Sequence, residues 1–536
     1  MSTATETPTR REWLGLIAVS LGVALIVVDL TIVNVILAPI IGDLEISSIQ
    51  AQWVQESYAI VFAALLLLTG RLSDLYGARK LFLIGLAVFG ATSLLAALAP
   101  SGALLILARF VQGIGGAMIL PTSLALINAA FSGEARGRAF AIWGSTIGAA
   151  AAVGPLLGGW LADFSWRWAF GINIPAVLLI GVGVLRYLPA AIPGRGRVDV
   201  IGALLSIFGL GLLSFGLIEG RAHGWLLTTE PLSLGGVEWS GGPSPVLIAF
   251  VLSAVTLIAF WLRQSRLGRR GAEPLMDVRL FGIRSFRQGN AVTLLVGLGE
   301  FGIIAVLPLW LQFTLDYSAL QAGLALVPLA VGSFCASGAS FSLAASVSAL
   351  GQVRIGLGLE AAGLVLLGVF AAADSAWWTI AVALFVYGIG VGFATAQVTN
   401  VAMADIPAAS AGQGSGIQSA ARELGSALGI AMLTTLFFSS LGAGVRDRLA
   451  DAGLPDEAAE QFGTAVTDSA GSVVPALAAD PATESIAASA REAMSAAVEL
   501  SSCLCAALLG AALLATLLMT PKPAPTTEPT PEPSHQ

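Results

Sequence analysis

A short charged stretch between two long apolar runs decides the fold: Gly70-Arg71-Leu72-Ser73-Asp74-Leu75-Tyr76-Gly77-Ala78-Arg79-Lys80. The flanking runs cover residues 51–70 and 81–99, and each has the roughly 20 apolar residues that a helix needs to cross a bilayer. Glycines at both ends of the stretch suit tight turns, and its acid and bases could form salt bridges at helix ends. The segment therefore predicts two antiparallel membrane helices joined by a charged turn.

The rest of the chain repeats this pattern of apolar runs and short polar turns. Only 11% of the residues are charged and 56% are hydrophobic, with a mean hydropathy of +0.86. A soluble protein carries roughly 25% charged residues. Hydropathy predicts fourteen spans, at residues 13–41, 51–70, 81–99, 102–127, 138–163, 168–188, 199–218, 245–264, 289–313, 320–346, 353–372, 376–401, 415–440 and 498–519. The chain is therefore predicted to be an all-α membrane protein.

Basic residues fall mainly on one side of these spans. If the N-terminus lies inside, most of the 26 Lys and Arg residues lie in inside segments. The outside segments hold Arg167, Arg221, Arg446, Arg448 and Arg491. Because Lys and Arg accumulate in cytoplasmic loops, both termini are predicted to be cytoplasmic, in a multi-pass protein of a bacterial inner (plasma) membrane.

The composition and motifs exclude several classes of function. A net charge of −7 offers no basic surface for nucleic acid. No G-x-x-x-x-G-K-[ST] phosphate loop occurs, so this chain is not expected to use ATP. Three cysteines are too few for a metal site, and no cluster of His, Asp or Ser indicates an enzyme. We therefore predict no catalytic residues, no metal and no cofactor, and transport driven by an ion or substrate gradient.

Two charged residues lie well inside predicted spans. Asp29 is midway along the first span, and Arg109 is in the fourth, on one helical face with Gln112. A charge near the bilayer centre costs about 2.5–3.5 kcal/mol, so each needs a reason to be there. We predict that Asp29 and Arg109 pair, and that a proton competes with the arginine for the carboxylate. A permanent structural pair is the alternative.

Other polar residues within spans are candidates for a substrate cavity. Glu56, near the outer end of the second span, and Glu300, midway along the ninth, could meet a cationic substrate. An interface position for Glu56 and helix pairing for Glu300 are the alternatives. The remaining cavity candidates are Asn34, Gln112, Trp310 and Gln312. Four further acids are predicted to be solvated near helix ends: Glu219, Glu360, Asp374 and Asp405.

The fifth span contains the glycine-rich stretch Gly154-Pro155-Leu156-Leu157-Gly158-Gly159. Gly154 and Gly158 are four residues apart, which lets another helix approach closely. Pro155 removes a backbone donor and bends the helix. The stretch predicts tight helix contact and a flexible seam between moving parts.

Together these segments resemble the major facilitator superfamily, and within it the fourteen-span drug:proton antiporters of the multidrug efflux type. The charged turn resembles the superfamily's signature between its second and third helices. That resemblance implies a gating latch formed by Gly70, Arg71, Asp74, Gly77 and Arg79. Asp29 to Pro39 and Arg109 to Gly116 resemble the antiporters' first-helix motif and their fourth-helix motif, which is associated with proton coupling. Gly154 to Gly159 resembles their fifth-helix antiport motif.

The resemblance implies two six-helix bundles around a midplane cavity, with two extra transmembrane helices. The predicted divisions are an N-terminal bundle at 1–190, a linker with the inserted helices at 191–288, a C-terminal bundle at 289–519 with an extracytoplasmic loop at 441–497, and a disordered cytoplasmic tail at 520–536. The second-half counterpart of the latch, at 340–354, contains no acid.

The implied function is proton-driven export of small organic molecules, amphipathic or cationic, by a monomer in a lipid bilayer. An exporter dedicated to one endogenous metabolite, such as a lipid, siderophore, antibiotic or amino acid, is the alternative. A membrane sensor or scaffold without transport is disfavoured by the charges inside the spans. No span contains a histidine, so a proton relay would have to use carboxylates and water.

Overall fold

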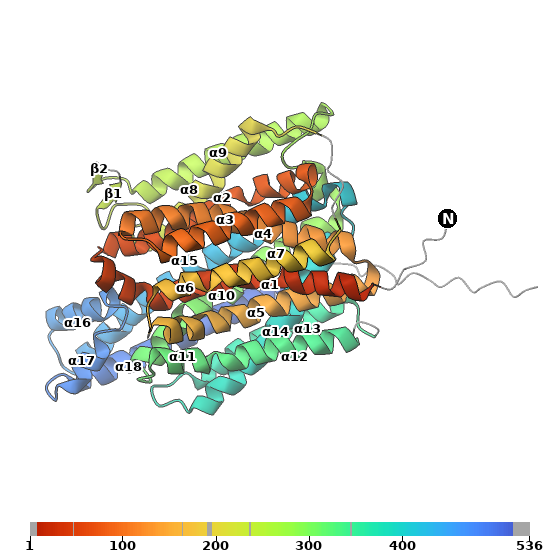
Figure 1. Cartoon of the computed structure of the whole chain (residues 1–536). Helices are drawn as coiled ribbons and strands as arrows, with labels where there is room; N and C mark the ends of the chain where they lie inside the picture. Colours follow the sequence, from red (N-terminus) through yellow and green to blue (C-terminus); the bar gives the residue numbers. More distant parts are fainter. Residues whose placement is uncertain are drawn as a thin grey trace, which may run out of the picture.

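Long helices that run along one common axis make up most of the described chain (Figure 1). The computed structural model describes residues 8–46, 48–162, 164–189, 196–234, 237–343 and 346–517. The predicted disordered tail at 520–536 lies outside them.

The chain divides into an N-terminal half, an inserted pair of helices and a C-terminal half. The N-terminal half contains α1 (Arg10–Leu44), α2 (Ser48–Tyr76), α3 (Ala78–Ala97), α4 (Gly102–Ala130), α5 (Gly133–Ala162), α6 (Arg167–Gly171) and α7 (Asn173–Tyr187). The insert contains α8 (Val200–His223), β1 (Leu232–Leu234), β2 (Val237–Trp239) and α9 (Pro245–Arg269). The C-terminal half contains α10 (Arg284–Phe313), α11 (Ala319–Ala325), α12 (Val327–Leu343), α13 (Ala349–Phe370), α14 (Trp377–Met403), α15 (Ala411–Asp451), α16 (Asp456–Asp468), α17 (Val474–Ala479) and α18 (Glu484–Leu517). Short 3-10 turns, η1 (Val278–Gly282) and η2 (Ala408–Ser410), precede α10 and α15, and β1 and β2 pair as a small antiparallel hairpin.

Polar caps at the turns explain where several of these helices begin. The side-chain oxygens of Thr9, Ser101, Ser244, Ser318 and Ser348 accept hydrogen bonds from backbone N–H groups of the first turn. Such caps satisfy donors that have no partner within the helix. The chain therefore turns at polar sites between its apolar runs.

The predicted all-α membrane fold is confirmed. Thirteen described spans are long and apolar enough to cross a membrane, counting α6 with α7 and α11 with α12. The remaining predicted span, 138–163, corresponds to α5, a helix of 30 residues that packs against α1 and α12. Large apolar side chains such as Leu179, Phe334 and Trp377 are exposed on the outer surface, which suits contact with lipid.

Two predicted spans are broken, and two helices extend beyond their predicted ends. Spans 168–188 and 320–346 each divide into a short and a long helix shortly before a proline, Pro175 and Pro328. Proline lacks a backbone N–H, so it suits the start of the second helix and not the interior of a continuous one. Both α15 and α18 continue into the predicted loop 441–497, where α16 and α17 join them in a helical lobe.

Each half has its own hydrophobic core. One cluster of buried side chains comes almost entirely from α10–α18, and two others come mainly from α1–α7. The halves meet where α5 packs against α12 and α14, and where α2 packs against α15. The inserted helices α8 and α9 pack on each other, and α8 also contacts α2.

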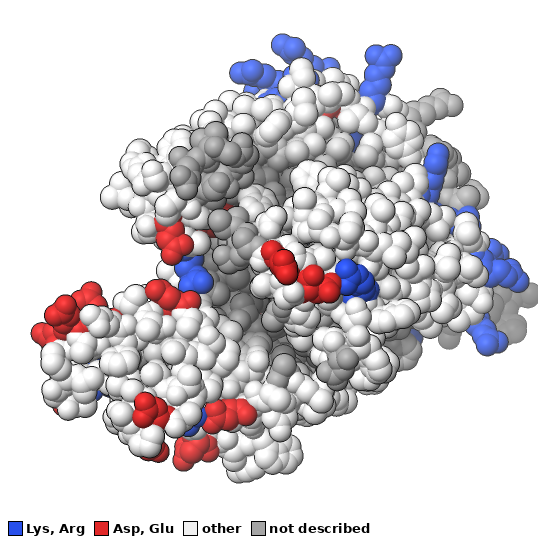
Figure 2. Space-filling view, turned by 60° about the vertical axis from the view of Figure 1, so that its left-hand side comes forward, with Lys and Arg blue, Asp and Glu red and all other residues white. Residues whose placement is uncertain are grey.

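The two ends of the helix stack differ in charge. Asp and Glu side chains gather at the end that carries α16 and α17, whereas Lys and Arg side chains lie mostly towards the opposite end (Figure 2). We call these the acidic end and the basic end. In the same view, the surface is hollowed beside the helical lobe at the acidic end.

Close packing of α13 on α14 predicts which glycines of α13 are structural. An added Cβ at Gly363 would lie 2.5–2.7 Å from the backbone N, Cα and Cβ of Tyr387, whereas at Gly358 it would meet nothing within 4 Å. We expect Gly363→Ala to lower the stability of the purified protein by about 1–3 kcal/mol, because two helix backbones must move apart. Gly358→Ala is the matched control. Thermal unfolding in detergent checks both, and equal melting temperatures would contradict the predicted packing.

Candidate functional site

A buried ion pair joins α1 to α4. Asp29 is 0% exposed and Arg109 is 1% exposed, and the Arg109 Nη1 donates to Asp29 Oδ2. Arg109 also donates from Nε to the Val54 carbonyl on α2 (3.1 Å), and its guanidinium lies 4.5 Å from the centre of the Tyr58 ring. The predicted pairing of these two residues is confirmed.

Neutral side chains complete the surroundings of the Asp29 carboxylate. Its Oδ1 accepts hydrogen bonds from Gln112 Nε2 (3.0 Å) and Asn173 Nδ2 (2.9 Å). Both amides also donate to Ser93 Oγ, at 2.9 and 3.2 Å. The break between α6 and α7 places Asn173 at the start of α7, close to this network. Donors on α4 and α7 thus replace the water that the carboxylate loses on burial, and Ser93 on α3 holds both amides.

Sequence reasoning did not assign Asn173 or Ser93 to this site. The available signal was weak, because Asn173 is a single uncharged polar residue two positions before Pro175. Ser93 is an ordinary small residue within an apolar span.

Glycines of α5 bring that helix against α1 beside the ion pair. An added Cβ at Gly154 would overlap the Thr31 side chain, and one at Gly158 would lie 3.0 Å from Ile32. The predicted tight contact of these two glycines is therefore confirmed. Gly159 differs, because an added Cβ there meets nothing within 4 Å. The side chain of Pro155 is outside the described part of the chain.

A second group of buried charges lies in the C-terminal half. Glu300 on α10 is 3% exposed and pairs with Arg422 on α15, with 3.4 Å between Oε2 and Nη2. The Thr395 hydroxyl on α14 donates to Glu300 Oε1. Glu423, the residue after Arg422, is half-buried and lies within electrostatic reach of Tyr58 on α2. Arg422 therefore bonds across helices to Glu300.

The cavity candidates do not gather around one open chamber. Gln112 and Glu300 are buried in the two charge networks. Trp310 is 0% exposed in the core of the C-terminal half, and its indole donates to Ser495 Oγ (3.0 Å), so the prediction that it lines a cavity is wrong. Gln312 is half-buried and donates to the Pro308 carbonyl of its own helix. Glu56 is half-buried on α2, and the side chain of Asn34 is outside the described part.

Two acids that were expected to be solvated are buried. Glu219 is 1% exposed and lies 3.2 Å from His223, one turn further along α8. Glu360 is 0% exposed in the middle of α13. The expectation for Glu219 failed because α8 continues to His223, beyond the predicted end at 218. Glu360 lies within the predicted span, and α13 begins four residues earlier than predicted, which places Glu360 in the middle of the helix and against α14. Asp374 and Asp405 are exposed, as expected.

The predicted latch residues join the two halves at the basic end. The carboxylate of Asp74 accepts hydrogen bonds from the backbone N–H groups of Gly412 (2.6 Å) and Gln413 (2.8 Å), at the start of α15. A helix N-terminus carries a partial positive charge, so it is a suitable partner for an acid. An added Cβ at Gly70 would lie 2.5 Å from the Gly412 carbonyl oxygen. Asp74 thus binds a helix end directly, without the salt bridge predicted for this turn.

The basic latch residues bind elsewhere. Arg71 Nη2 lies 3.2 Å from Glu273 Oε2, beyond α9, and Arg79 Nη2 donates to the Leu185 carbonyl on α7 (2.7 Å). Gly77 has a positive φ of 89° at the turn into α3, a conformation that favours glycine. Glu273 therefore links the inserted helices to the latch.

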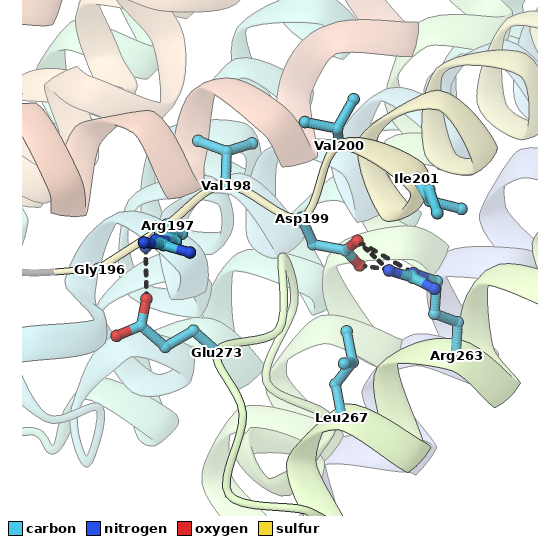
Figure 3. A pocket seen from close by; sticks show the side chains of 9 residues that line it. All are labelled: Gly196, Arg197, Val198, Asp199, Val200, Ile201, Arg263, Leu267 and Glu273. Atoms are coloured by element: carbon cyan, nitrogen blue, oxygen red, sulfur yellow. Dashed lines mark hydrogen bonds and ion pairs between the residues drawn. The ribbon is translucent and has the colours of Figure 1, made fainter.

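A pocket of about 660 Å³, lined by both polar and apolar residues, lies beside Glu273 at the basic end (Figure 3). Its lining comes from residues 196–201, from α9 and from Glu273, and it includes a two-pronged ion pair between Asp199 and Arg263. Burial of Asp199 acts to raise its pKa, but hydrogen bonds from Arg263 and Gln264 hold that pKa below its usual value. None of the predicted cavity residues lines this pocket, so it is not the predicted substrate site.

Neutral amides occupy the corresponding region of the C-terminal half. The Ser340 hydroxyl bonds to Gln352 on α13, and Gln397 on α14 donates to Ser340 (2.9 Å). Across the seam, Arg136 on α5 donates to Asn400 (3.2 Å). The segment 340–354, which contains no acid, is therefore held by hydrogen bonds of Ser340 with Gln352 and Gln397 and not by an ion pair of an acid.

A family model described as Major Facilitator Superfamily matches residues 19–430. The chain belongs to the Major Facilitator Superfamily. It is 33% identical over 448 residues to a "Probable actinorhodin transporter" of Streptomyces coelicolor, covering 81% of this chain and 74% of that one. It is also 33% identical to a "Multidrug resistance protein Stp" of Mycobacterium tuberculosis, covering 83% and 80% of the two chains.

Solved structures agree on the fold of this major facilitator protein. The human organic anion transporter MFSD10 superposes with a TM-score of 0.59 at 14% identity, covering 94% of this chain and 99% of the other. That likeness shows the fold alone. The predicted membership of the major facilitator drug-efflux family is confirmed by the sequence relatives, and the chain is a transporter, not an enzyme.

The buried ion pair of this transporter predicts an order of stabilities. Arg109→Gln leaves Asp29 without its cation, a loss that costs about 3–5 kcal/mol in buried pairs. Removing both charges, in Asp29→Asn with Arg109→Gln, should restore most of that stability. Thermal unfolding in detergent compares the two variants. A double variant no more stable than Arg109→Gln would show that the charges do not compensate each other.

The latch predicts that Asp74 holds the basic end closed. Asp74→Asn removes a charge from two hydrogen bonds to the start of α15, and bonds to charged groups are worth roughly 1.5–3 kcal/mol each. We expect the variant to raise the rate at which a cysteine at Ser415, a buried α15 position, reacts with a maleimide by about tenfold or more, in a background without native cysteines. Glu134→Gln, at an exposed acid of the same end, is the control. Equal rates in both variants would contradict the latch.

Proposed function

We propose that this protein is a proton-driven exporter of small organic compounds, with a proton and Arg109 competing for the Asp29 carboxylate. The observation that carries the proposal is the complete burial of this pair, with Gln112 and Asn173 on the same carboxylate. A buried charge pair with its own hydrogen-bond network is costly to build and suits a switch. No cofactor is needed, because the proton gradient supplies the free energy.

Protonation of Asp29 would change the forces between α1 and α4. The neutral acid no longer attracts the guanidinium, which keeps the Val54 carbonyl, Gln112 and the Tyr58 ring as partners. Since α1 also contacts α5 through Gly154 and Gly158, and α5 contacts α12 and α14, a shift of α1 would reach the seam between the halves. Proton binding would thereby favour one arrangement of the two halves over the other.

The charge asymmetry supports an orientation. We assign the basic end to the cytoplasm, which places both termini there and the α16–α17 lobe outside. Asp74 joins the two halves at the end that we assign to the cytoplasm, which favours a state in which exchange occurs with the outside. Separate cores within each half suit rocking of one against the other in a monomer embedded in lipid.

The names of the relatives support two alternatives for the substrate range, one broad and one narrow. One is named as a multidrug resistance protein, which favours several amphipathic or cationic compounds. Another is named as a probable transporter of a single antibiotic, which favours one endogenous metabolite. Efflux of a panel of unrelated compounds from cells separates the two, because a dedicated exporter should act on one chemical class only.

The coupling role of Asp29 predicts the effect of removing its charge. In everted vesicles under an acid pulse, Asp29→Asn should lower proton-driven transport of ethidium, or of the panel compound with the fastest efflux, by at least about tenfold. The amide cannot take up or release a proton. Asp374→Asn, at an exposed acid, is the control. Transport by Asp29→Asn at the wild-type rate would rule out coupling at this residue.

A further inference from the structure

A second buried carboxyl group has no place in the mechanism above. Glu360 lies in the middle of α13 and is 0% exposed, and neither of its carboxyl oxygens has a hydrogen-bond partner among the described residues. An added Cβ at Gly390 on α14 would lie 2.6 Å from Glu360 Cγ, so the two helices are in close contact at this point. An ionised carboxylate in such surroundings costs several kcal/mol unless a cation compensates it.

The charged and titratable groups around Glu360 come from three other helices. They are Glu300 on α10, Tyr387 on α14 and Arg422 on α15, and Cys505 on α18 interacts with Tyr387. Tyr387 directs its hydroxyl to the backbone carbonyl of Glu300 (3.2 Å), and Arg422 pairs with the Glu300 carboxylate. Arg422 therefore bonds to Glu300 and also lies within electrostatic reach of Glu360.

The balance of buried acids and bases differs between the C-terminal half and the N-terminal half. There, Asp29 and Arg109 balance each other. In the C-terminal half, Glu300 and Glu360 are buried beside the single base Arg422, and the half-buried Glu423 also interacts with that base. Acids therefore outnumber bases in this group. A proton on one acid lowers the excess negative charge, and Glu360 is the acid whose carboxyl oxygens have no hydrogen-bond partner among the described residues.

We propose that Glu300 and Glu360 form a second proton-binding site of the transport cycle, which holds its proton on Glu360 in this arrangement of the helices. The proposal rests on the proposed function, because it adds a proton to a proton-driven cycle. The step is an acid–base equilibrium: the Glu360 carboxyl group releases a proton to water and becomes a carboxylate. Release leaves two carboxylates beside Arg422, so it requires that the guanidinium move between them or that water enter. Deprotonation is thereby tied to a rearrangement of α10, α13 and α15.

Polar side chains lead from Glu300 towards the basic end. Thr399 lies one turn after Thr395 on α14, and its hydroxyl donates to the Thr395 carbonyl (3.1 Å). Gln418 on α15 donates to Thr293 Oγ1 (2.8 Å) and lies 3.5 Å from Thr399 Oγ1. Gln418 Oε1 is buried and has no hydrogen-bond partner in the described chain, so it is available to a water molecule. This line of groups gives the proton a route to the end that we assign to the cytoplasm.

Infrared difference spectra of the purified, substrate-free transporter test the second site. Spectra recorded between alkaline and acidic pH report the carboxyl C=O stretch of acids that take up protons. We expect the wild type to show a buried-carboxyl component that Glu360→Gln removes and that Asp29→Asn retains. Glu300→Gln should also remove it, because Arg422 then pairs with Glu360 and keeps it ionised. Glu499→Gln, at an exposed acid of α18, is the control and should retain the component.

The outcomes separate this inference from the proposed function. A buried component unchanged in Glu360→Gln would overturn the second site, because Glu360 would then hold its proton permanently or never bind one. Loss of the component in Glu360→Gln but not in Glu300→Gln would also overturn it, because the two acids would not act together. The proposed function would fail on a different result, namely wild-type transport that does not depend on the proton gradient. Thermal unfolding of each variant shows that it is folded.

Discussion

A charge can remain inside a membrane only if the protein replaces the water that the charge has lost. At Asp29 four helices do so: α4 supplies a guanidinium and an amide, α7 supplies an amide, α3 supplies a hydroxyl that orders both amides, and α2 binds the arginine from its other side. The arrangement of the N-terminal half depends on this requirement. Because these groups come from separate helices, a shift of any one of them changes the environment of the charges.

The same requirement is met differently at the other charged sites. In the C-terminal half, Arg422 pairs with Glu300, and Glu360 has no hydrogen-bond partner among the described residues, so we assign a proton to it in our proposal. At the basic end, Asp74 is compensated by the start of α15, a partner that disappears as soon as the halves separate. Glu273 and Arg71 connect the inserted helices to the same region. The contacts that close the basic end and the contacts that hold the buried charges therefore belong to the same packed helices.

Much of this could be predicted from the sequence because the cost of a buried charge is large and local. An arginine and an aspartate in two apolar runs need each other, and the pairing of Asp29 with Arg109 follows. The burial of Glu360 could not be predicted, because it depends on how α13 packs against α14 and α18. Trp310 was misplaced for a related reason: hydropathy indicates that a residue is in the membrane but not which side of its helix faces the core. The position of Asn173 beside Asp29 depends on the break before α7, and only the packed structure locates that break.

The account's central claim is that the protonation state of Asp29 sets the arrangement of the two halves. Distances between spin labels at the basic ends of α2 and α15, measured by double electron–electron resonance across a pH series, test it most directly. We predict that acidification shifts the wild-type distance distribution and that Asp29→Asn shows the acidic distribution already at alkaline pH. Identical pH responses in the wild type and in Asp29→Asn would contradict the claim.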